Sequence, residues 1–329
     1  MRTRPADLTD GDLKVSLFAG WGLDAIRLEY VPVGGGSHHW LAHDAAAKRH
    51  WVTVDALDHD KDYLGGTPAE AFKGLRRALD VALALRETGL EFVVAPRPST
   101  RGESVTPLGA RYAVAMYPYL DGTSGHFYVP FSPDQRAQVV DMLVRLHQAT
   151  PAVAALARPS RLTVQSRQAL EDALNNLGQP WTGGPFSEPA RAVVASHAPA
   201  LRRLLARFDR LATEVAAAVT EQVITHGEPH PANFISADGR LFMVDWDTVA
   251  LGPPERDLWM VTTETELTRY TELSGRRVDH RALRLYRLRW LLDDISIVVG
   301  GFRSAHGRTA DTEHAWQALT RSLASPDIV

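Results

Sequence analysis

The sequence predicts an α+β protein in which a small antiparallel sheet comes first and a mainly helical part follows. Short alternating or apolar runs between turn residues are typical of strands, and such runs occupy residues 25–33, 38–42, 51–57, 92–96 and 112–117. Beyond residue 123 the apolar residues recur with helical period, over residues 132–147, 163–178, 187–219, 258–273, 278–300 and 311–324. We therefore expect a sheet-containing part over 1–117, a connection over 118–123 and a helical part over 124–329.

Helix start signals support this division. Thr9 or Asp10 is placed to cap a first helix over residues 7–20. Thr67 followed by Pro68 predicts the start of a second helix that runs to about Glu87. A capping-box pattern at residues 132–135 predicts the start of the first helix of the helical part.

Composition bounds the function. The chain has 329 residues, a formal net charge of -3 and no cysteine. A net negative charge argues against nucleic-acid binding, and it mildly favours a neutral or cationic small substrate. Without cysteine, neither disulfides nor thiolate metal sites can form. We find no secretory signal and no membrane-spanning apolar stretch, so we expect a cytoplasmic protein without nucleic-acid or membrane partners, either monomeric or homodimeric.

Two polar clusters flank a hairpin signal in residues 224–258. His226, Glu228 and Asn233 form the first cluster, and Asp245 and Asp247 form the second. Between them, two short apolar runs surround a turn centred on Asp-Gly, which is a strong hairpin signal. A hairpin would bring Asn233 and Asp245 side by side, with Glu228 close by. Oxygen-bearing side chains gathered in this way indicate a hard divalent cation and a general base.

A zinc site is excluded in the same segment. Pro229 and Pro231 break any helix that could place two histidines on one face, and the glutamate lies outside the spacing that such a helix needs. The zinc deaminase pattern requires cysteines. The other reading of the segment is that its acids are solvated turn groups and its histidines packing residues.

The spacing of these residues resembles the catalytic segment of the protein kinases. His226, Glu228 and Asn233 stand at the offsets of H-R-D-x-x-x-x-N, and residues 244–246 stand where D-F-G would. The residues at these positions are most similar to those of the aminoglycoside phosphotransferase family, and within it to the spectinomycin phosphotransferase branch. The resemblance implies a bilobal, protein-kinase-like α+β fold, with an N-lobe over 1–117, a hinge over 118–123 and a C-lobe over 124–329.

The resemblance also implies roles for the two clusters. Glu228 would accept the proton of the substrate hydroxyl, at an offset where the family usually has aspartate. Asn233 and Asp245 would bind Mg²⁺ on the phosphates of ATP or GTP. Asp247 would assist the metal or a bound water. His226 and Asp257 would support the catalytic loop.

In the N-lobe, the resemblance assigns the phosphate-binding turn to Gly34, Gly35, Gly36 and Ser37. The next strand departs from the family, because Thr53 stands where the phosphate-binding lysine belongs. The nearby lysines are Lys48, on a turn, and Lys61, in the following loop. Glu70 is placed where a helix carboxylate would pair such a lysine, but without one it is better explained as a first-turn acid.

The resemblance places the adenine edge at the hinge, against backbone groups near Met116, Tyr117 and Tyr119. A plain strand end with aromatic packing is the alternative. Asp293 and Asp294 lie in an otherwise apolar helix and would receive ammonium groups of an amino sugar or aminocyclitol, or else form a solvated face. His147 is expected to be a hydrogen-bonded core histidine.

The function implied is ATP- or GTP-dependent phosphorylation of a hydroxyl on an aminoglycoside- or aminocyclitol-like compound, of the antibiotic-resistance type. A kinase of another small metabolite is one alternative. A kinase-like protein that binds nucleotide or ligand without efficient transfer is the other, because Thr53 and Glu228 both depart from the family pattern.

Overall fold

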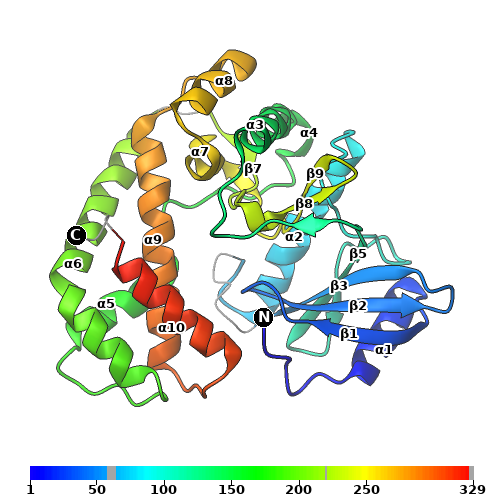
Figure 1. The fold of residues 1–329 in the computed structure, drawn as a ribbon, viewed down its shortest axis with the longest axis horizontal. Helices are drawn as coiled ribbons and strands as arrows, with labels where there is room; N and C mark the ends of the chain where they lie inside the picture. Colours follow the sequence, from blue (N-terminus) through cyan, green and yellow to red (C-terminus); the bar gives the residue numbers. More distant parts are fainter. Residues whose placement is uncertain (58–63, 219–220, 326–329) are drawn as a thin grey trace. The chain divides into compact units, whose positions relative to one another are not determined.

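The structure is a computed structural model that describes residues 1–57, 64–218 and 221–325. The chain folds into two compact units, formed by residues 1–160 with 221–279 and by residues 161–220 with 280–329. The helices of the first unit are α1 (Asp10–Trp21), α2 (Pro68–Glu87), α3 (Pro133–Gln148), α4 (Thr150–Val153), α7 (Glu255–Val261) and α8 (Glu264–Ser274), with a 3₁₀ turn η1 (Pro231–Asn233). The second unit contains α5 (Arg167–Asn175), α6 (Ser187–Ala217), α9 (His280–Arg303) and α10 (Ala310–Leu323) (Figure 1).

The predicted antiparallel sheet is confirmed. Five strands lie in the order β1-β2-β3-β5-β4, and every neighbouring pair is antiparallel (Figure 1). They are β1 (Ala25–Val31), β2 (His38–Asp44), β3 (Arg49–Ala56), β4 (Thr106–Leu108) and β5 (Tyr112–Pro118). The remaining strands are β6 (Thr123–Ser124), β7 (Val223–Thr225), β8 (Phe234–Ala237), β9 (Arg240–Met243) and β10 (Ala250–Gly252).

The two faces of the five-stranded sheet carry different cores. Trp40, Val52 and Val54 are fully buried on one face, where they belong to the same apolar cluster as the leucines of α1. Ala113 and Ala115 of β5 belong to a second cluster, formed with α2. Because side chains alternate along a strand, the β3 residues between the two valines and beside them face away from the α1 core.

The expected strand at 92–96 is wrong. These residues form only an isolated parallel bridge, Val93 to Met243. Phe92 accepts a hydrogen bond from the backbone N–H of Met243 (2.7 Å), and Val94 donates one to the Met243 carbonyl (3.0 Å). The segment thus ties the sheet-containing part to β9, and Pro96, which has no N–H, prevents a longer ladder. Strand β4 (Thr106–Leu108) lies instead in a segment for which no strand is expected.

The hairpin predicted from Asp-Gly is confirmed. Strands β8 and β9 pair in register from Phe234 opposite Met243 to Ala237 opposite Arg240. Asp238 and Gly239 form the two-residue turn, with φ values of 49° and 72°. Two consecutive positive φ values are the signature of the turn type that matches strand twist, and they explain the Asp-Gly pair.

The predicted helix starts are also confirmed. Thr9 and Ser132 form capping boxes, and the Thr67 side chain caps α2. The expected helix 258–273 is divided, because Thr263 begins a new capping box with Glu266. Residue 219, the expected end of the long helix 187–219, lies outside the described residues.

The second unit is a helical assembly with its own core. Helices α6 and α9 run side by side (Figure 1), and their buried leucines belong to one cluster that also includes residues of α5 and α10. The unit is built from two separate chain segments, so its limits differ from the predicted division at residues 117 and 123, which stays a prediction. Across the described residues, every helix is too short or too polar to cross a bilayer.

Candidate active site

The β8–β9 hairpin brings Asn233 and Asp245 to neighbouring backbone positions. The carbonyl oxygen of Asn233 accepts a hydrogen bond from the N–H of Val244 (3.0 Å), the residue before Asp245. The Asn233 side-chain amide donates to the carbonyl oxygen of Glu228 (2.9 Å). One buried asparagine therefore holds the segment of the candidate base and the segment of the second candidate metal ligand.

Asp245 has an unusual backbone. Its φ is 66°, in the left-handed region that non-glycine residues rarely adopt and that costs on the order of 1 kcal/mol. The next residue, Trp246, is fully buried, and its Nε1 donates to the Met243 carbonyl (3.0 Å). Strained residues of this kind cluster at functional sites, where the surroundings hold them in place.

His226 joins the two clusters from inside the protein. Its Nε2 donates to the carbonyl oxygen of Val244 (2.9 Å), and its Nδ1 accepts from the N–H of Glu228 (3.2 Å). Only the neutral imidazole can do both, and burial accordingly lowers the pKa of His226. These two hydrogen bonds fit the expectation that His226 supports the loop.

Asp257 braces the same loop. Its carboxylate accepts hydrogen bonds from the N–H groups of His226 (2.9 Å) and Gly227 (2.6 Å), and a third from Nε2 of His147 (3.1 Å). Burial alone would raise the pKa of Asp257, but the hydrogen bond from His147 and the nearby Arg256 charge outweigh it, so the pKa is lowered. His147 also contacts the Tyr270 hydroxyl (2.7 Å), as expected for a core histidine.

Arg256 was missed as a site residue in the sequence. It donates to the Thr225 hydroxyl (2.7 Å) and to the Thr248 carbonyl (2.8 Å). Gly227 has φ 102°, and a Cβ there would lie 2.3 Å from the Arg256 guanidinium. The sequence signal for this close contact was a glycine between His226 and Glu228, with Glu-Arg-Asp at residues 255–257.

Glu228 is half-buried beside His230. The carboxylate Oε2 lies 4.0 Å from Nε2 of His230. Burial and the neighbouring His226 lower the pKa of His230 to about 4. The histidine is therefore neutral at physiological pH, and the pair is not an ion pair there. The negative charge of Glu228, which a general base needs, is not neutralised by His230.

The predicted phosphate-binding turn joins β1 to β2. Gly34 has a positive φ of 74°, which suits a glycine at this turn. The Ser37 hydroxyl donates to the carboxylate of Asp55 on β3 (2.6 Å), and both side chains are buried. The hydrogen of the Ser37 hydroxyl is therefore already used within the sheet.

Thr53 lies in the middle of β3, opposite His39 of β2 and Ala115 of β5. Its hydroxyl is 3.2 Å from Nδ1 of His39. Glu70 accepts a hydrogen bond from Thr67 (2.9 Å) at the start of α2, so its cap role is the one observed. Lys61 lies outside the described residues.

The hinge positions lie at the end of β5. The carbonyl of Met116 accepts from the N–H of Arg97 (2.6 Å). Tyr119 lies under the Arg49 guanidinium, 4.0 Å from the ring centroid, and Arg49 also pairs with Asp121 (2.9 Å). Aromatic packing is thus present here, as the alternative explanation required, while Tyr117 and Tyr119 continue the backbone beyond Met116.

Asp293 and Asp294 lie on α9 in the second unit. Asp293 accepts from the N–H of Gln165 (2.6 Å) and pairs with Arg289 (3.2 Å). In the described part of the chain, no group donates a hydrogen bond to the Asp294 carboxyl. Burial, together with the charge of Asp293, raises the pKa of Asp294 to about 7. Of the two acids, Asp294 is therefore the one whose charged form a nearby cation would stabilise more.

Asp294 makes the stability of the protein depend on pH. Its folded pKa lies above the unfolded value, so its stabilising contribution is complete below about pH 4 and is lost as pH rises through about 7. We expect Asp294→Asn to be more stable than wild type by about 2–4 kcal/mol at pH 8, and equal to it near pH 4. Chemical denaturation at the two pH values measures this difference.

Asp293→Asn is the matched control, because it removes the ion pair with Arg289. The gain in unfolding free energy at pH 8 relative to pH 4 should be smaller for Asp293→Asn than for Asp294→Asn. A free-energy difference between Asp294→Asn and wild type that is the same at pH 4 and pH 8 would contradict the raised pKa.

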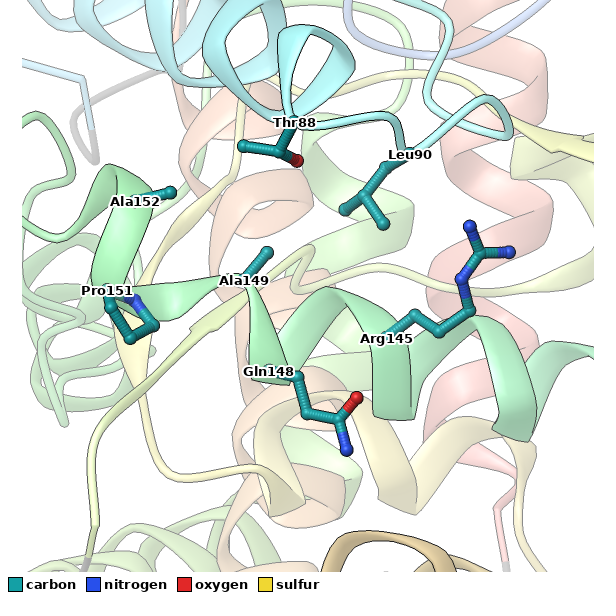
Figure 2. Close-up of a pocket in the computed structure, with 7 residues that line it drawn as sticks. All are labelled: Thr88, Leu90, Arg145, Gln148, Ala149, Pro151 and Ala152. Atoms are coloured by element: carbon teal, nitrogen blue, oxygen red, sulfur yellow. The ribbon is translucent and has the colours of Figure 1, made fainter.

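A hollow elsewhere in the first unit is lined without any carboxylate. It has a volume of about 390 Å³ and lies between the end of α2 and the α3–α4 corner (Figure 2). Its lining residues are Thr88, Leu90, Arg145, Gln148, Ala149, Pro151 and Ala152. None of the predicted site residues is among them, so this hollow is separate from the candidate active site.

The donors near Asn233 suit a metal bound together with a ligand. Among the described residues, no group of three or more histidine, aspartate or glutamate side chains forms a metal cage. Mg²⁺ does not need one, since it is usually held by one or two carboxylates with waters and substrate phosphates. The amide oxygen of Asn233 and the Asp245 carboxylate are oxygen donors of this kind.

Most of the chain matches a known protein family. Residues 61–295 match the model of the phosphotransferase enzyme family. The protein StrN of Streptomyces griseus is 28% identical over 264 residues, which are 76% of this chain and 77% of StrN.

Solved structures share the fold. The spectinomycin phosphotransferase APH(9)-Ia in complex with ADP and spectinomycin has a TM-score of 0.74 at 16% identity, covering 98% of this chain and 96% of that one. The macrolide 2′-phosphotransferase MphH from Brachybacterium faecium has a TM-score of 0.54 at 18% identity, covering 96% and 98%. The predicted kinase-like fold class is therefore confirmed.

Proposed function

Because the chain belongs to the phosphotransferase enzyme family, we propose that it transfers the γ-phosphoryl group of ATP or GTP to a hydroxyl of an aminoglycoside- or aminocyclitol-like molecule. The family makes it a phosphotransferase, and its fold is that of small-molecule kinases. One observation carries the proposal. Asn233 bonds through its side chain to the Glu228 backbone and through its backbone to Val244, so base and metal ligands share one rigid frame.

In the proposed reaction Glu228 acts as the base. The acceptor hydroxyl loses its proton to the Glu228 carboxylate as its oxygen forms a bond to the γ-phosphorus. The bond between that phosphorus and the β–γ bridging oxygen breaks, and the nucleoside diphosphate leaves. The neutral state of His230 helps, because a cationic neighbour would lower the proton affinity of the glutamate.

Asn233 and Asp245 would hold Mg²⁺, and Asp247 would assist through a bound water. The metal supplies neutralising charge at the phosphate oxygens. The left-handed backbone of Asp245 lies between the hairpin and buried Trp246, which supports a carboxylate held in a fixed place for this role. Preorganised electrostatics is the main source of catalysis in phosphoryl transfer.

The nucleotide would lie against the β1–β2 turn and the hinge. Gly34, Gly35 and Gly36 would offer backbone N–H groups to the phosphates. Since the Met116 carbonyl is already bonded to Arg97, the base edge would be read by backbone groups at Tyr117 and Tyr119. Neighbours of the same fold bind ADP, AMP or AMP-PNP, which supports a nucleotide as co-substrate.

The acceptor would carry an amine. A half-buried carboxyl whose pKa is raised gains most from a cation placed beside it, and Asp294 is such a group. The spectinomycin complex of the structural neighbour supports an aminocyclitol as the class to test first.

Asp245→Ala tests the metal assignment. We expect it to weaken binding of Mg²⁺-ATP or Mg²⁺-GTP by about 10- to 100-fold, since a ligand carboxylate is lost. Binding of the same nucleotide in EDTA should be unchanged, because no metal contributes there. Titration calorimetry with and without Mg²⁺ makes both measurements, and equal Mg²⁺-dependent affinity in wild type and variant would refute the assignment.

Phosphate transfer decides between the proposal and a binding-only protein. Wild type is incubated with Mg²⁺-ATP or Mg²⁺-GTP and a panel of spectinomycin, aminoglycosides, choline and simple sugars, and products are followed by mass spectrometry. A gain of one phosphoryl group on an aminocyclitol or aminoglycoside supports the proposal. Nucleotide binding without transfer to any acceptor favours the alternative.

A further inference from the structure

Thr53 leaves a gap at the position of the missing strand lysine, and Lys48 cannot fill it. Lys48 lies on the β2–β3 turn, five positions before Thr53, which is about 16 Å along a strand. A lysine side chain is much shorter than that distance. Arg49, one position further along, pairs with Asp121 and covers Tyr119. Neither Lys48 nor Arg49 therefore replaces the lysine.

His39 of β2 stands beside this gap. It is the register partner of Thr53 on the neighbouring strand, and paired residues on adjacent strands share a face of the sheet. Its Nδ1 lies 3.2 Å from the Thr53 hydroxyl. The His39 ring centroid is 5.2 Å from that of Trp51, a β3 residue on the same face of the sheet. The imidazole thus covers the position that a lysine side chain would leave from residue 53.

The other ring nitrogen of His39 faces the glycine turn. A Cβ placed on Gly34 would lie 3.3 Å from Nε2. Gly34, in the turn, and His39, the second residue of β2, are therefore in close contact at the start of this strand. This is where the phosphates of a nucleotide lie if the turn has the role proposed above.

We propose that His39 supplies the side-chain donor to the nucleotide phosphates that Thr53 cannot supply. The inference rests on the proposed function, because it assumes that a triphosphate lies beneath the glycine turn. The proposal assigns one tautomer to His39, in which the Thr53 hydroxyl donates to Nδ1 and the ring hydrogen is on Nε2, the nitrogen next to the turn. Thr53 is then a positioning residue that fixes the tautomer and orientation of His39.

The decisive measurement compares ligands with and without phosphates. Dissociation constants of Mg²⁺-ATP and Mg²⁺-GTP are measured by calorimetry, and those of adenosine and guanosine by ligand-observed NMR. We expect His39→Ala to weaken binding of the triphosphate about 10- to 100-fold, the range for a charge-assisted hydrogen bond. Nucleoside binding should be unchanged, whereas a distorted sheet would weaken both.

His43→Ala is the matched control. His43 lies on the same strand and the same face, four residues further on, and pairs with Glu29 (3.0 Å) away from the turn. It should bind triphosphate as wild type does. A rescue variant, His39→Ala with Thr53→Lys, restores a cation at the family position and should recover triphosphate affinity.

Arg2→Ala and Lys61→Ala complete the set, since Arg2 donates to the Gly34 carbonyl (3.4 Å) and Lys61 is the first lysine after β3 in the sequence. Loss of triphosphate affinity in one of these, with His39→Ala unchanged, would overturn the inference and assign the role to that residue. Failure of wild type to bind either triphosphate would overturn the proposed function as well. His39→Gln, which keeps a donor, provides a second variant should His39→Ala not fold.

Discussion

Glu228→Gln is expected to lower kcat for phosphoryl transfer by about 10²- to 10⁴-fold, the contribution of a positioned general base. The amide cannot take the hydroxyl proton, yet it has the size of the carboxylate and can keep the contact with His230. Nucleotide affinity should change little, because Asn233 bonds to the backbone of Glu228 and not to its side chain. Steady-state kinetics with saturating Mg²⁺-nucleotide measures the effect.

Glu228→Asp is the informative companion. It keeps the carboxylate and restores the residue that the family usually has at this offset, but withdraws the charge by one methylene. A misplacement near 1 Å costs about 100-fold in rate, so we expect activity between those of wild type and Glu228→Gln. Full activity in Glu228→Gln would show that the proton leaves by another route.

Asp257→Asn is expected to lower the free energy of unfolding by about 3–5 kcal/mol, the cost of breaking a buried charged network. Its carboxylate accepts from His226 N–H, Gly227 N–H and the His147 ring, and all are buried or nearly so. The asparagine turns one acceptor into a donor facing these N–H groups. Because the network carries the backbone of the catalytic loop, transfer activity should fall with stability.

Chemical denaturation followed by tryptophan fluorescence gives the unfolding free energy. Asp141→Asn is the control, since Asp141 makes only an exposed ion pair with Arg269 (2.7 Å), and such pairs contribute little. Equal stability of Asp257→Asn and wild type would mean that the loop is held by Arg256 and hairpin contacts alone.

The local parts of the site could be predicted from the sequence. Asp238-Gly239 fixed the hairpin turn, and the hairpin in turn put Asn233 beside the segment of Asp245. Threonine and serine caps marked the starts of α1, α2 and α3 correctly. These features depend on backbone preferences of a few adjacent residues, which a single sequence displays directly.

Features that depend on distant contacts could not be predicted. Residues 92–96 have strand composition, but their partner is β9, some 150 positions away, and the pairing stops after one bridge. His39 could not be singled out, because its importance comes from being opposite Thr53, and strand register is set by the whole sheet. The pKa of Asp294 likewise follows from burial, which periodicity alone does not quantify.

The chain alternates between its two compact units, so neither is made in one stretch on the ribosome. Residues 161–220 are synthesised first, and the partner segment of their core, from residue 280, follows only after 221–279. At roughly 5–20 residues per second, the apolar face of α6 waits several seconds for α9. During that interval the leucine-rich face of α6 is open to chaperones, so we expect the yield in cells to depend on translation speed and on the supply of holdases.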